Sequence, residues 1–331
     1  MIWDPSSALA DDARDVASAV AHEALALLTV SEDSPHPARI AAAVVGASLA
    51  AAAVAAAVAL VLLILGGISD VVVETASRST AGTVRVRPRT TPTSNHVVLV
   101  GFGQRSQWPQ ASPFVCKLDA FLRVSGIKFR LEPARSAADL PTGKVPVLHF
   151  RGEVLSDSHF IVKRLVAEGL APDFDADLTA AERARAECLR HALESVVYWG
   201  FVRERWCNDA IWPHTEAEYF ASLPWAIRAI VIRFVVRPGV VRAAHAVGVS
   251  RYTQSQWESI LADCFASLAA QLGTNRFIMG DRISTVDFTA FGILANCIYY
   301  EELNPVMARH ACMHTNLVEY TARLHREWIR S

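Results

Sequence analysis

The sequence predicts one membrane-spanning helix followed by a folded part with an α/β half and an all-helical half. Three observations lead to this fold class. First, the 30 residues from 40 to 69 carry no charged side chain. Second, after His96 the strand and helix signals follow in the order β-α-β and then β-β-α. Third, the apolar spacing from residue 172 onwards is helical.

Residues 1–38 form a predicted acidic tail. Seven acidic residues stand against Arg14 and Arg39 in the first 39 residues. This balance disfavours a mitochondrial transit peptide, because such peptides are rich in arginine and poor in acids. A cleavable signal peptide is also disfavoured, since the apolar stretch starts late and is too long.

Residues 39–69 are the predicted transmembrane helix. A helix needs about 20 apolar residues to cross a bilayer core. The alternative is a buried helix of a soluble domain, which is rarely uncharged over such a length. Four arginines follow the span within 70–95 and two precede it. The positive-inside bias therefore places the C-terminal part on the cytoplasmic side, with 70–95 as a linker rich in Ser, Thr, Pro and Arg.

The overall composition excludes some classes of function. With 32 basic and 33 acidic residues the net charge is -1, so no basic excess indicates nucleic-acid binding. None of the six cysteines forms a Cys-x-x-Cys pair, which disfavours a zinc site or a disulfide framework. His310 and His314 share a predicted helix face, but Cys312 points elsewhere. We therefore predict no metal site.

The segment NHVVLVGFGQRSQWPQASPFVCKL, which starts at Asn95, allows two interpretations. Gly101 and Gly103 follow an apolar run, as in a dinucleotide-binding turn. However, Ser106 stands where that turn needs its third glycine. Trp108-Pro109 also interrupts the helix that should follow. We therefore predict a strand that ends at these glycines and no dinucleotide site.

Ser112 and Pro113 predict the start of the first helix, as N-cap and first helical residue. Gly126 predicts its end. The later elements are strands at 127–133, 145–150 and 152–158 and a helix at 159–169. This order is that of a thioredoxin-like half, which we place at 96–171. Such a half carries a cis proline at the start of its third strand, here Val145-Pro146.

Residues 172–331 form the predicted all-helical half. Thr179 with Glu182, and Ser284 with Asp287, have the spacing of capping boxes and are assigned as structural caps. The stretch SLPWAIRAIVIRFVVRPGVVRAAHAVG alternates apolar residues with arginines. We favour a packed helix pair with solvated arginines. A helix lying on an anionic membrane surface is the alternative.

Several motifs, which follow one another in order, resemble the glutathione S-transferase superfamily. KVPVLHFRGEVLSDSHFIVKRL, which starts at Lys144, is similar to the family's VPVL…(E/D)S stretch, and STVD at Ser284 resembles a helix start of its helical half. SPFVCKLDAFLRVSGIKFR, LESVVYWGFVRERW, HAVGVSRYTQ and FIMGDRISTVDFTAFGILA resemble the branch that contains metaxins, the failed-axon-connections protein and cadmium-response relatives. The resemblance covers residues 96–331.

This resemblance implies a glutathione site in the thioredoxin-like half. The backbone of Val145, beside Pro146, would pair with the tripeptide like an added strand. Asp157 and Ser158 would hold the γ-glutamyl amine and carboxylate, although one of them must also cap the following helix. Lys144 would reach the other carboxylate.

Ser112 is the candidate catalytic residue. A hydroxyl at a helix N-terminus can donate to a thiolate and favour its ionised form. Its simpler role is that of an N-cap alone. Cys116 follows one helical turn later on the apolar side, so we expect it in the core. A thiol–disulfide oxidoreductase is therefore disfavoured.

Two functions stay open. The first is a membrane-anchored glutathione transferase-like enzyme that conjugates glutathione, as co-substrate, to hydrophobic electrophiles. The second is a non-catalytic, metaxin-like binding or assembly module at a membrane. The intact VPVL…SDS stretch favours the first, and the long segment GQRSQWPQASPF favours the second. We expect a single-pass membrane protein with its C-terminal domain in the cytoplasm. A homodimer is a possible assembly. The mitochondrial outer membrane is the alternative for a eukaryotic chain.

Overall fold

The computed structural model describes residues 97–102, 109–134, 140–221, 223, 225 and 228–328. The predicted acidic tail (1–38), transmembrane helix (39–69) and linker (70–95) lie outside these residues. Among the helices of the described residues, none has the length and apolar character that crossing a membrane requires.

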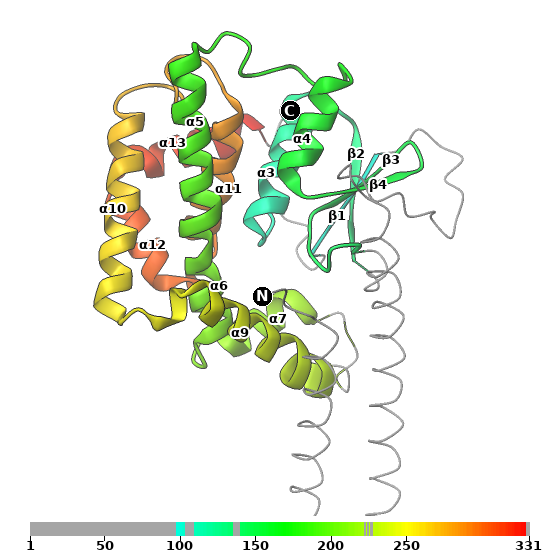
Figure 1. Cartoon of the computed structure of the whole chain (residues 1–331), viewed down its shortest axis with the longest axis vertical. Helices are drawn as coiled ribbons and strands as arrows, with labels where there is room; N and C mark the ends of the chain where they lie inside the picture. Colours follow the sequence, from blue (N-terminus) through cyan, green and yellow to red (C-terminus); the bar gives the residue numbers. More distant parts are fainter. Residues whose placement is uncertain are drawn as a thin grey trace, which may run out of the picture. The chain divides into compact units, whose positions relative to one another are not determined.

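A four-stranded sheet forms the α/β half (Figure 1). Its strands are β1 (Val97–Gly101), β2 (Phe129–Pro133), β3 (Val147–Phe150) and β4 (Glu153–Ser156). Their order across the sheet is β2-β1-β3-β4, with β1 and β2 parallel and the other pairs antiparallel. The parallel pair needs a crossover connection, and helix α3 (Pro113–Val124) supplies it. The predicted order of strands and helices is therefore confirmed.

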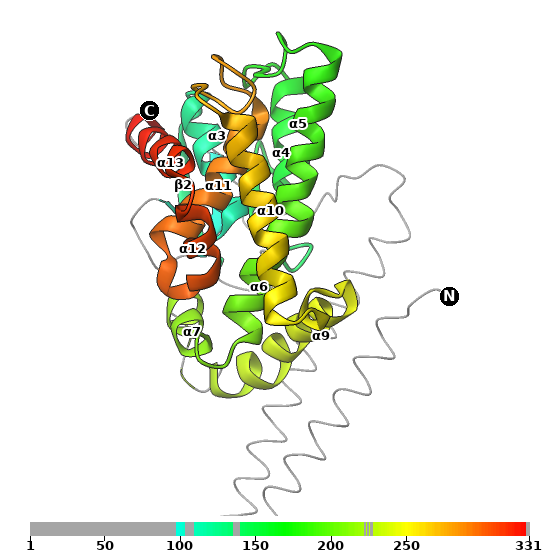
Figure 2. The ribbon, with the colours of Figure 1, turned by 90° about the vertical axis from the view of Figure 1, so that its left-hand side faces the viewer.

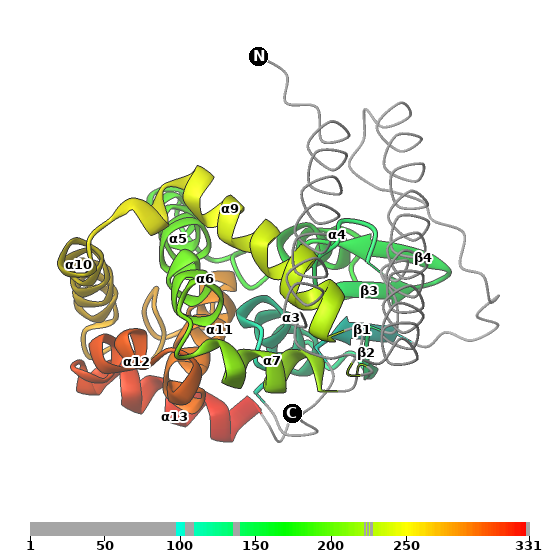
Figure 3. The same ribbon diagram turned by 90° about the horizontal axis from the view of Figure 1, so that it is seen from below.

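Helices α3 and α4 (Ser158–Ala167) lie side by side, between the sheet and the helical half (Figure 3). Both end in a left-handed turn at a glycine, Gly126 with φ 70° and Gly169 with φ 69°. Glycine adopts this backbone conformation without strain, so these residues stop the helices where the sequence predicts.

The helical half consists of a long series of helices (Figure 2). The segments η2 and η3 are π-helical, and η4 and η5 are short 3-10 helices. They are α5 (Ala180–Ala192), η2 (Leu193–Val197), α6 (Tyr198–Cys207), α7 (Trp212–Phe220), η3 (Arg228–Val236), α9 (Arg237–Val247), η4 (Val249–Arg251), α10 (Gln254–Leu272), α11 (Thr285–Tyr299), η5 (Glu301–Leu303), α12 (Pro305–Cys312) and α13 (Thr315–Trp328). The arginine-rich stretch folds as η3 and α9. The π-helical η3 continues directly into the α-helical α9.

Capping boxes begin α5 and α11, at the positions that the sequence predicts. At α5, the Glu182 carboxylate accepts the Thr179 N–H (2.8 Å). At α11, Asp287 Oδ2 accepts from the Ser284 N–H (2.8 Å) and hydroxyl (2.7 Å). The buried Asp287 also accepts a hydrogen bond from the Tyr320 hydroxyl (2.8 Å) on α13. This second box therefore joins two helices as well as capping one.

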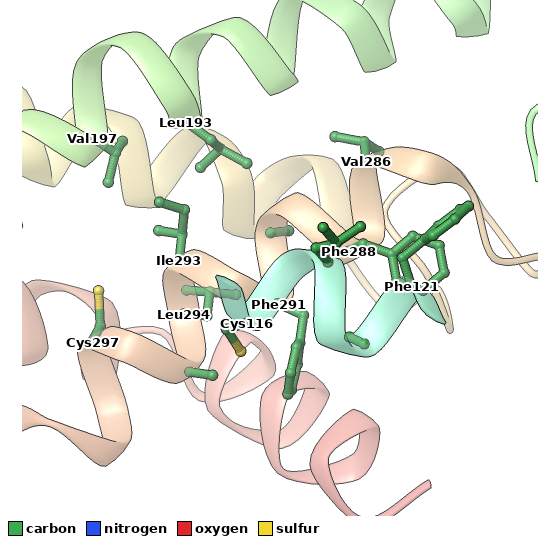
Figure 4. Close-up of a cluster of buried hydrophobic side chains, with 14 of the residues drawn as sticks. Cys116, Phe121, Leu193, Val197, Val286, Phe288, Phe291, Ile293, Leu294 and Cys297 are labelled. Atoms are coloured by element: carbon green, nitrogen blue, oxygen red, sulfur yellow. The ribbon is translucent and has the colours of Figure 1, made fainter. Parts of the chain in front are cut away.

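The core between the two halves lies where α3 packs against α11 (Figure 4). Phe121 of α3 and Phe288 of α11 meet edge to face with ring centroids 5.3 Å apart. The helices approach closely because Gly292 of α11 has no side chain. A Cβ there would lie 2.4 Å from the Pro113 carbonyl oxygen.

Candidate functional site

The termini of three neighbouring strands lie side by side at one end of the sheet, and we call this alignment the row. Continuing the antiparallel registers of β1 with β3, and of β3 with β4, by one position aligns Gly101, Pro146 and Asp157. The Val145–Pro146 peptide bond is cis, as the sequence predicts. The row therefore places the cis proline between the exit of β1 and the residue that precedes α4.

The first turn of α3 lies against the same row. A Cβ on Gly101 would stand 2.9 Å from Val115 Cγ1, so the last residue of β1 must be very small. Ser112 is the N-cap of α3, and its Oγ accepts the Val115 N–H at 3.4 Å. Only 6% of Ser112 is exposed. The N-terminus of α3, which carries a partial positive charge, thus lies close to Gly101 in the row.

The other predicted glutathione residues lie at this edge as well. Asp157 is exposed, has φ 71°, and accepts the His159 N–H at 2.9 Å, which makes it the N-cap of α4. A non-glycine residue with this φ is strained, and such strain is common at binding sites. Ser158 is buried, Lys144 is exposed and Val145 is half-buried.

The backbone before Ser112 is fastened to the helical half. The three consecutive carbonyl groups of residues 109–111 accept hydrogen bonds from Tyr300 (2.8 Å), Asn296 (3.0 Å) and Arg205 (2.6 Å), in this order. All three donors are buried. The sequence analysis missed this arrangement. Its one local signal was Asn296, a polar residue within the apolar run FGILANCIYY.

Arg205 is the centre of this network, which we call the loop clamp: Arg205, Tyr219, Asn296, Tyr300 and Asn304. The Arg205 guanidinium is 1% exposed and lies 4.6 Å from the centre of the Phe201 ring. It also donates to the Tyr219 hydroxyl (2.6 Å) and to Asn304 Oδ1. These acceptors are neutral, so a buried charge is held mainly by oriented dipoles.

A buried ion pair lies near the start of α4. Lys117 of α3 donates to Glu194 of η2 at 2.6 Å, and Glu194 also accepts from Arg190. Burial lowers the pKa of Lys117, while Glu194 acts in the opposite direction. Burial, followed by the charges of Arg190 and Lys117, lowers the pKa of His159. The cluster thus ties α3 to α5 and η2 and favours the neutral form of His159.

Cys116 is fully buried in the core, as the sequence predicts. Burial raises the pKa of its thiol well above the usual range, and Asp119 adds to the effect. Such a thiol is a poor nucleophile at neutral pH. Elsewhere in the described part of the chain, no three His, Cys, Asp or Glu side chains gather in a way that could hold a metal ion.

A separate groove of about 1110 Å³ lies within the helical half. Its lining comes from α6, the turn after α6, α9, η4, α10 and α12. Glu204, in its wall, accepts the N–H groups of Val306 (2.8 Å) and Met307 (2.9 Å) and so caps α12. Burial raises the pKa of Glu204 to about 7. None of the residues at the sheet-edge row lines this groove, so the two sites are distinct.

Two family models match the chain in the order of its halves. Residues 113–211 match the glutathione S-transferase N-terminal domain, and residues 261–324 match the glutathione S-transferase C-terminal domain. The first match runs past the sheet into α5 and α6. The match therefore includes α3, Pro146, Asp157 and these two helices, while Gly101 and Ser112 lie just before it.

Among curated proteins, human metaxin-2 is 22% identical over 213 residues, which cover 64% of this chain and 80% of that protein. Failed axon connections of Drosophila melanogaster is 23% identical over 217 residues, covering 61% of this chain and 50% of that protein. Both relatives belong to the branch that the sequence motifs resemble.

Solved structures include a glutathione S-transferase III in its apo form, with 16% identity, a TM-score of 0.45, and coverage of 71% of this chain and 96% of that one. Another is a beta-etherase from Sphingobium, with 14% identity, a TM-score of 0.47, and coverage of 70% and 99%. The family assignment rests instead on the two domain models and the curated relatives. The chain belongs to the glutathione S-transferase superfamily, in the branch that includes metaxin-2 and failed axon connections.

Proposed function

We propose that the chain is a membrane-tethered glutathione-binding protein, with its tripeptide site at the row of Gly101, Pro146 and Asp157. The alignment of these three strand ends beside the N-terminus of α3 carries the proposal. An extended peptide can add to a strand through main-chain hydrogen bonds. The backbone N–H and C=O of Val145, two residues before β3, would receive the tripeptide in this way.

The polar residues of the row suit the charged ends of glutathione. The exposed Asp157 carboxylate can accept from the γ-glutamyl amine. The start of α4, at Ser158, offers N–H groups and a partial positive charge to the γ-glutamyl carboxylate. The exposed Lys144 suits the glycine carboxylate at the opposite end of the tripeptide.

In the catalytic form of the proposal, Ser112 activates the glutathione sulfur. Its Oγ accepts a hydrogen bond from Val115, so the hydroxyl hydrogen can still be donated. This donation and the N-terminus of α3 both lower the thiol pKa. The thiolate sulfur then bonds to a carbon of a hydrophobic electrophile, and the leaving group departs with the electron pair of the bond that breaks.

One observation favours the second candidate function, a non-catalytic assembly module of metaxin type. Ser112 is buried and the backbone before it is held at three consecutive carbonyls. A fixed loop and a buried hydroxyl restrict the approach of a second substrate to the sulfur. In this form glutathione, or another extended peptide, would bind without turnover.

Titration calorimetry and a chlorodinitrobenzene assay on the detergent-purified full chain test these forms. We expect the wild type to bind glutathione and Asp157→Ala to weaken that binding at least tenfold, because a charge-assisted hydrogen bond is lost. If the enzyme form holds, Ser112→Ala lowers turnover roughly 100-fold with little change in binding.

Thr179→Ala is the matched control for these variants. It also removes a helix N-cap, that of α5, but this helix contributes no residue to the row. It should leave both measurements unchanged. Binding without turnover in the wild type would support the assembly module. No binding of glutathione at all would contradict both forms.

The tether is the span at 39–69, which the sequence predicts and which lies outside the described residues. We expect the full chain to remain in the membrane pellet after an alkaline carbonate wash, because an apolar helix of this length stays inserted. Release into the supernatant would contradict an integral anchor. It would not decide whether the chain binds glutathione, which the calorimetry measures separately.

A further inference from the structure

The segment from η3 to the turn after α9 has an unusual charge pattern. No acidic residue occurs between Glu218 and Glu258, while Arg228, Arg233, Arg237, Arg242 and Arg251 all lie in this interval. In a chain of net charge -1, this is a concentrated local excess of positive charge. Arg237 has a structural role, since it pairs with Asp209 and lies over the Trp212 ring.

The same segment exposes large apolar side chains. Among the described residues, seven large hydrophobic side chains are exposed. Phe234, Val247 and Tyr252 lie in this segment, and Trp225 lies just before it. Trp225 is 76% exposed and Val247 54%. So many exposed apolar side chains in one short segment indicate an interaction site rather than the scattered exposure that is normal at surfaces.

These side chains belong to a folded element. Ile232 of η3 is 4% exposed and Ala244 of α9 is fully buried, so the inner side of the segment packs against the helical half. The Arg237 guanidinium donates to the Trp206 carbonyl oxygen at 3.0 Å and so joins the start of α9 to the end of α6. The exposed residues Arg233, Phe234, Val247, Arg251 and Tyr252 thus belong to an anchored element, and the exposed Arg242 also borders the groove near Glu204.

Charge and chemistry together identify the partner. Aromatic side chains such as Trp, Tyr and Phe prefer the headgroup region of a bilayer, and arginines are attracted to anionic lipids. We define the η3–α9 surface as Arg233, Phe234, Arg242, Val247, Arg251 and Tyr252. We propose that this surface docks onto an anionic lipid bilayer. The uncharged segment at 40–69 supports this choice, because a tether in the same chain raises the effective concentration of a bilayer at the surface.

The proposal predicts protection of this segment by anionic lipid. The full chain is reconstituted with vesicles of phosphatidylcholine, with or without phosphatidylserine, and amide hydrogen exchange is followed by mass spectrometry. We expect exchange at 228–252 to slow several-fold with phosphatidylserine only. At about 1 M salt, where the Debye length falls to ~3 Å, the protection should disappear. Exchange in α11 reports that the fold is intact.

The triple variant Arg233→Gln, Arg242→Gln, Arg251→Gln should lose the protection, since each arginine near an anionic surface strengthens binding roughly fivefold. Its matched control neutralises three exposed arginines elsewhere, Arg130, Arg185 and Arg326, and should keep the protection.

Phe234→Ser tests the aromatic contribution and removes no charge. Protection that is absent, independent of lipid charge or unchanged in the triple variant would overturn the proposal, whether or not glutathione binds. Protection by an added acidic protein or nucleic acid in place of the vesicles would also overturn it.

Discussion

Replacing Arg205 with methionine is expected to lower the free energy of unfolding by about 4 kcal/mol. The side chain is 1% exposed and donates to Ala111, Tyr219, Asn296 and Asn304. Methionine fills similar space but leaves these buried acceptors without their donor. Each such loss costs about 1–3 kcal/mol, and the losses within one network are not additive. Urea denaturation of the detergent-purified full chain measures the change.

Arg203→Met is the matched control. Arg203 lies two residues earlier on α6 and also donates to backbone carbonyls, those of Val249 (2.7 Å) and Tyr252 (3.1 Å), but it is only half-buried. Water can replace its bonds, so we expect a loss of about 1 kcal/mol. Tyr300→Phe removes the hydroxyl that donates to the Pro109 carbonyl, and its loss of stability should fall between the other two. If Arg205→Met unfolds no more easily than Arg203→Met, the loop clamp does not hold the two halves together.

Replacing Gly292 with alanine should destabilise the junction of the two halves by about 1–3 kcal/mol or more. The new Cβ would stand 2.4 Å from the Pro113 carbonyl oxygen and 3.1 Å from the Lys117 nitrogen. Both atoms are backbone atoms of α3, so they cannot rotate away as a side chain can. The first turn of α3 would have to move away from α11, and Ser112 would move with it.

Gly239→Ala on α9 provides the opposite case. A Cβ at this position would have no atom within 4 Å, so only the helix propensity changes. Alanine is favoured over glycine by about 1 kcal/mol in a helix interior. We therefore expect Gly239→Ala to raise the thermal midpoint slightly and Gly292→Ala to lower it by several degrees. Equal effects of the two substitutions would contradict the close contact of α3 with α11.

Local signals explain why much of the fold could be predicted from the sequence. Ser112-Pro113 marks a helix start because a hydroxyl cap and a residue without N–H both suit the first turn. Apolar runs bounded by turns predict the order of the strands along the chain. A capping residue and an acidic residue three positions later predict each of the two capping boxes. Each of these features is encoded within a few neighbouring residues.

The loop clamp could not be predicted because its partners are far apart in the chain. Asn296 and Tyr300 bind carbonyl groups 186 and 191 residues earlier, and no spacing rule connects such positions. From the sequence, Gly101 is predicted only as the end of a strand. In the structure it also leaves room for Val115, a packing demand that the sequence pattern does not reveal. Local rules thus locate the ends of elements, while the contacts between the halves need the structure.

The loop clamp and the row of strand ends together define what the site can do. The row offers a pairing edge, an exposed carboxylate and a helix N-terminus, which suit an extended, charged peptide. The clamp holds the backbone at 109–111 in one conformation, so Ser112 is set in place before any ligand arrives. Preorganisation of this kind lowers the entropy lost on binding. It favours tight, specific binding over the accommodation of many ligands.

A structure of the full chain with S-hexylglutathione tests the central claim most directly. We predict that the cysteinyl backbone of the ligand pairs with Val145, that its γ-glutamyl group lies at Asp157 and Ser158, and that its sulfur faces the N-terminus of α3. The groove within the helical half, near Glu204, serves as an internal alternative site. A ligand bound in that groove, or bound nowhere, would contradict the assignment of the sheet-edge row as a glutathione site.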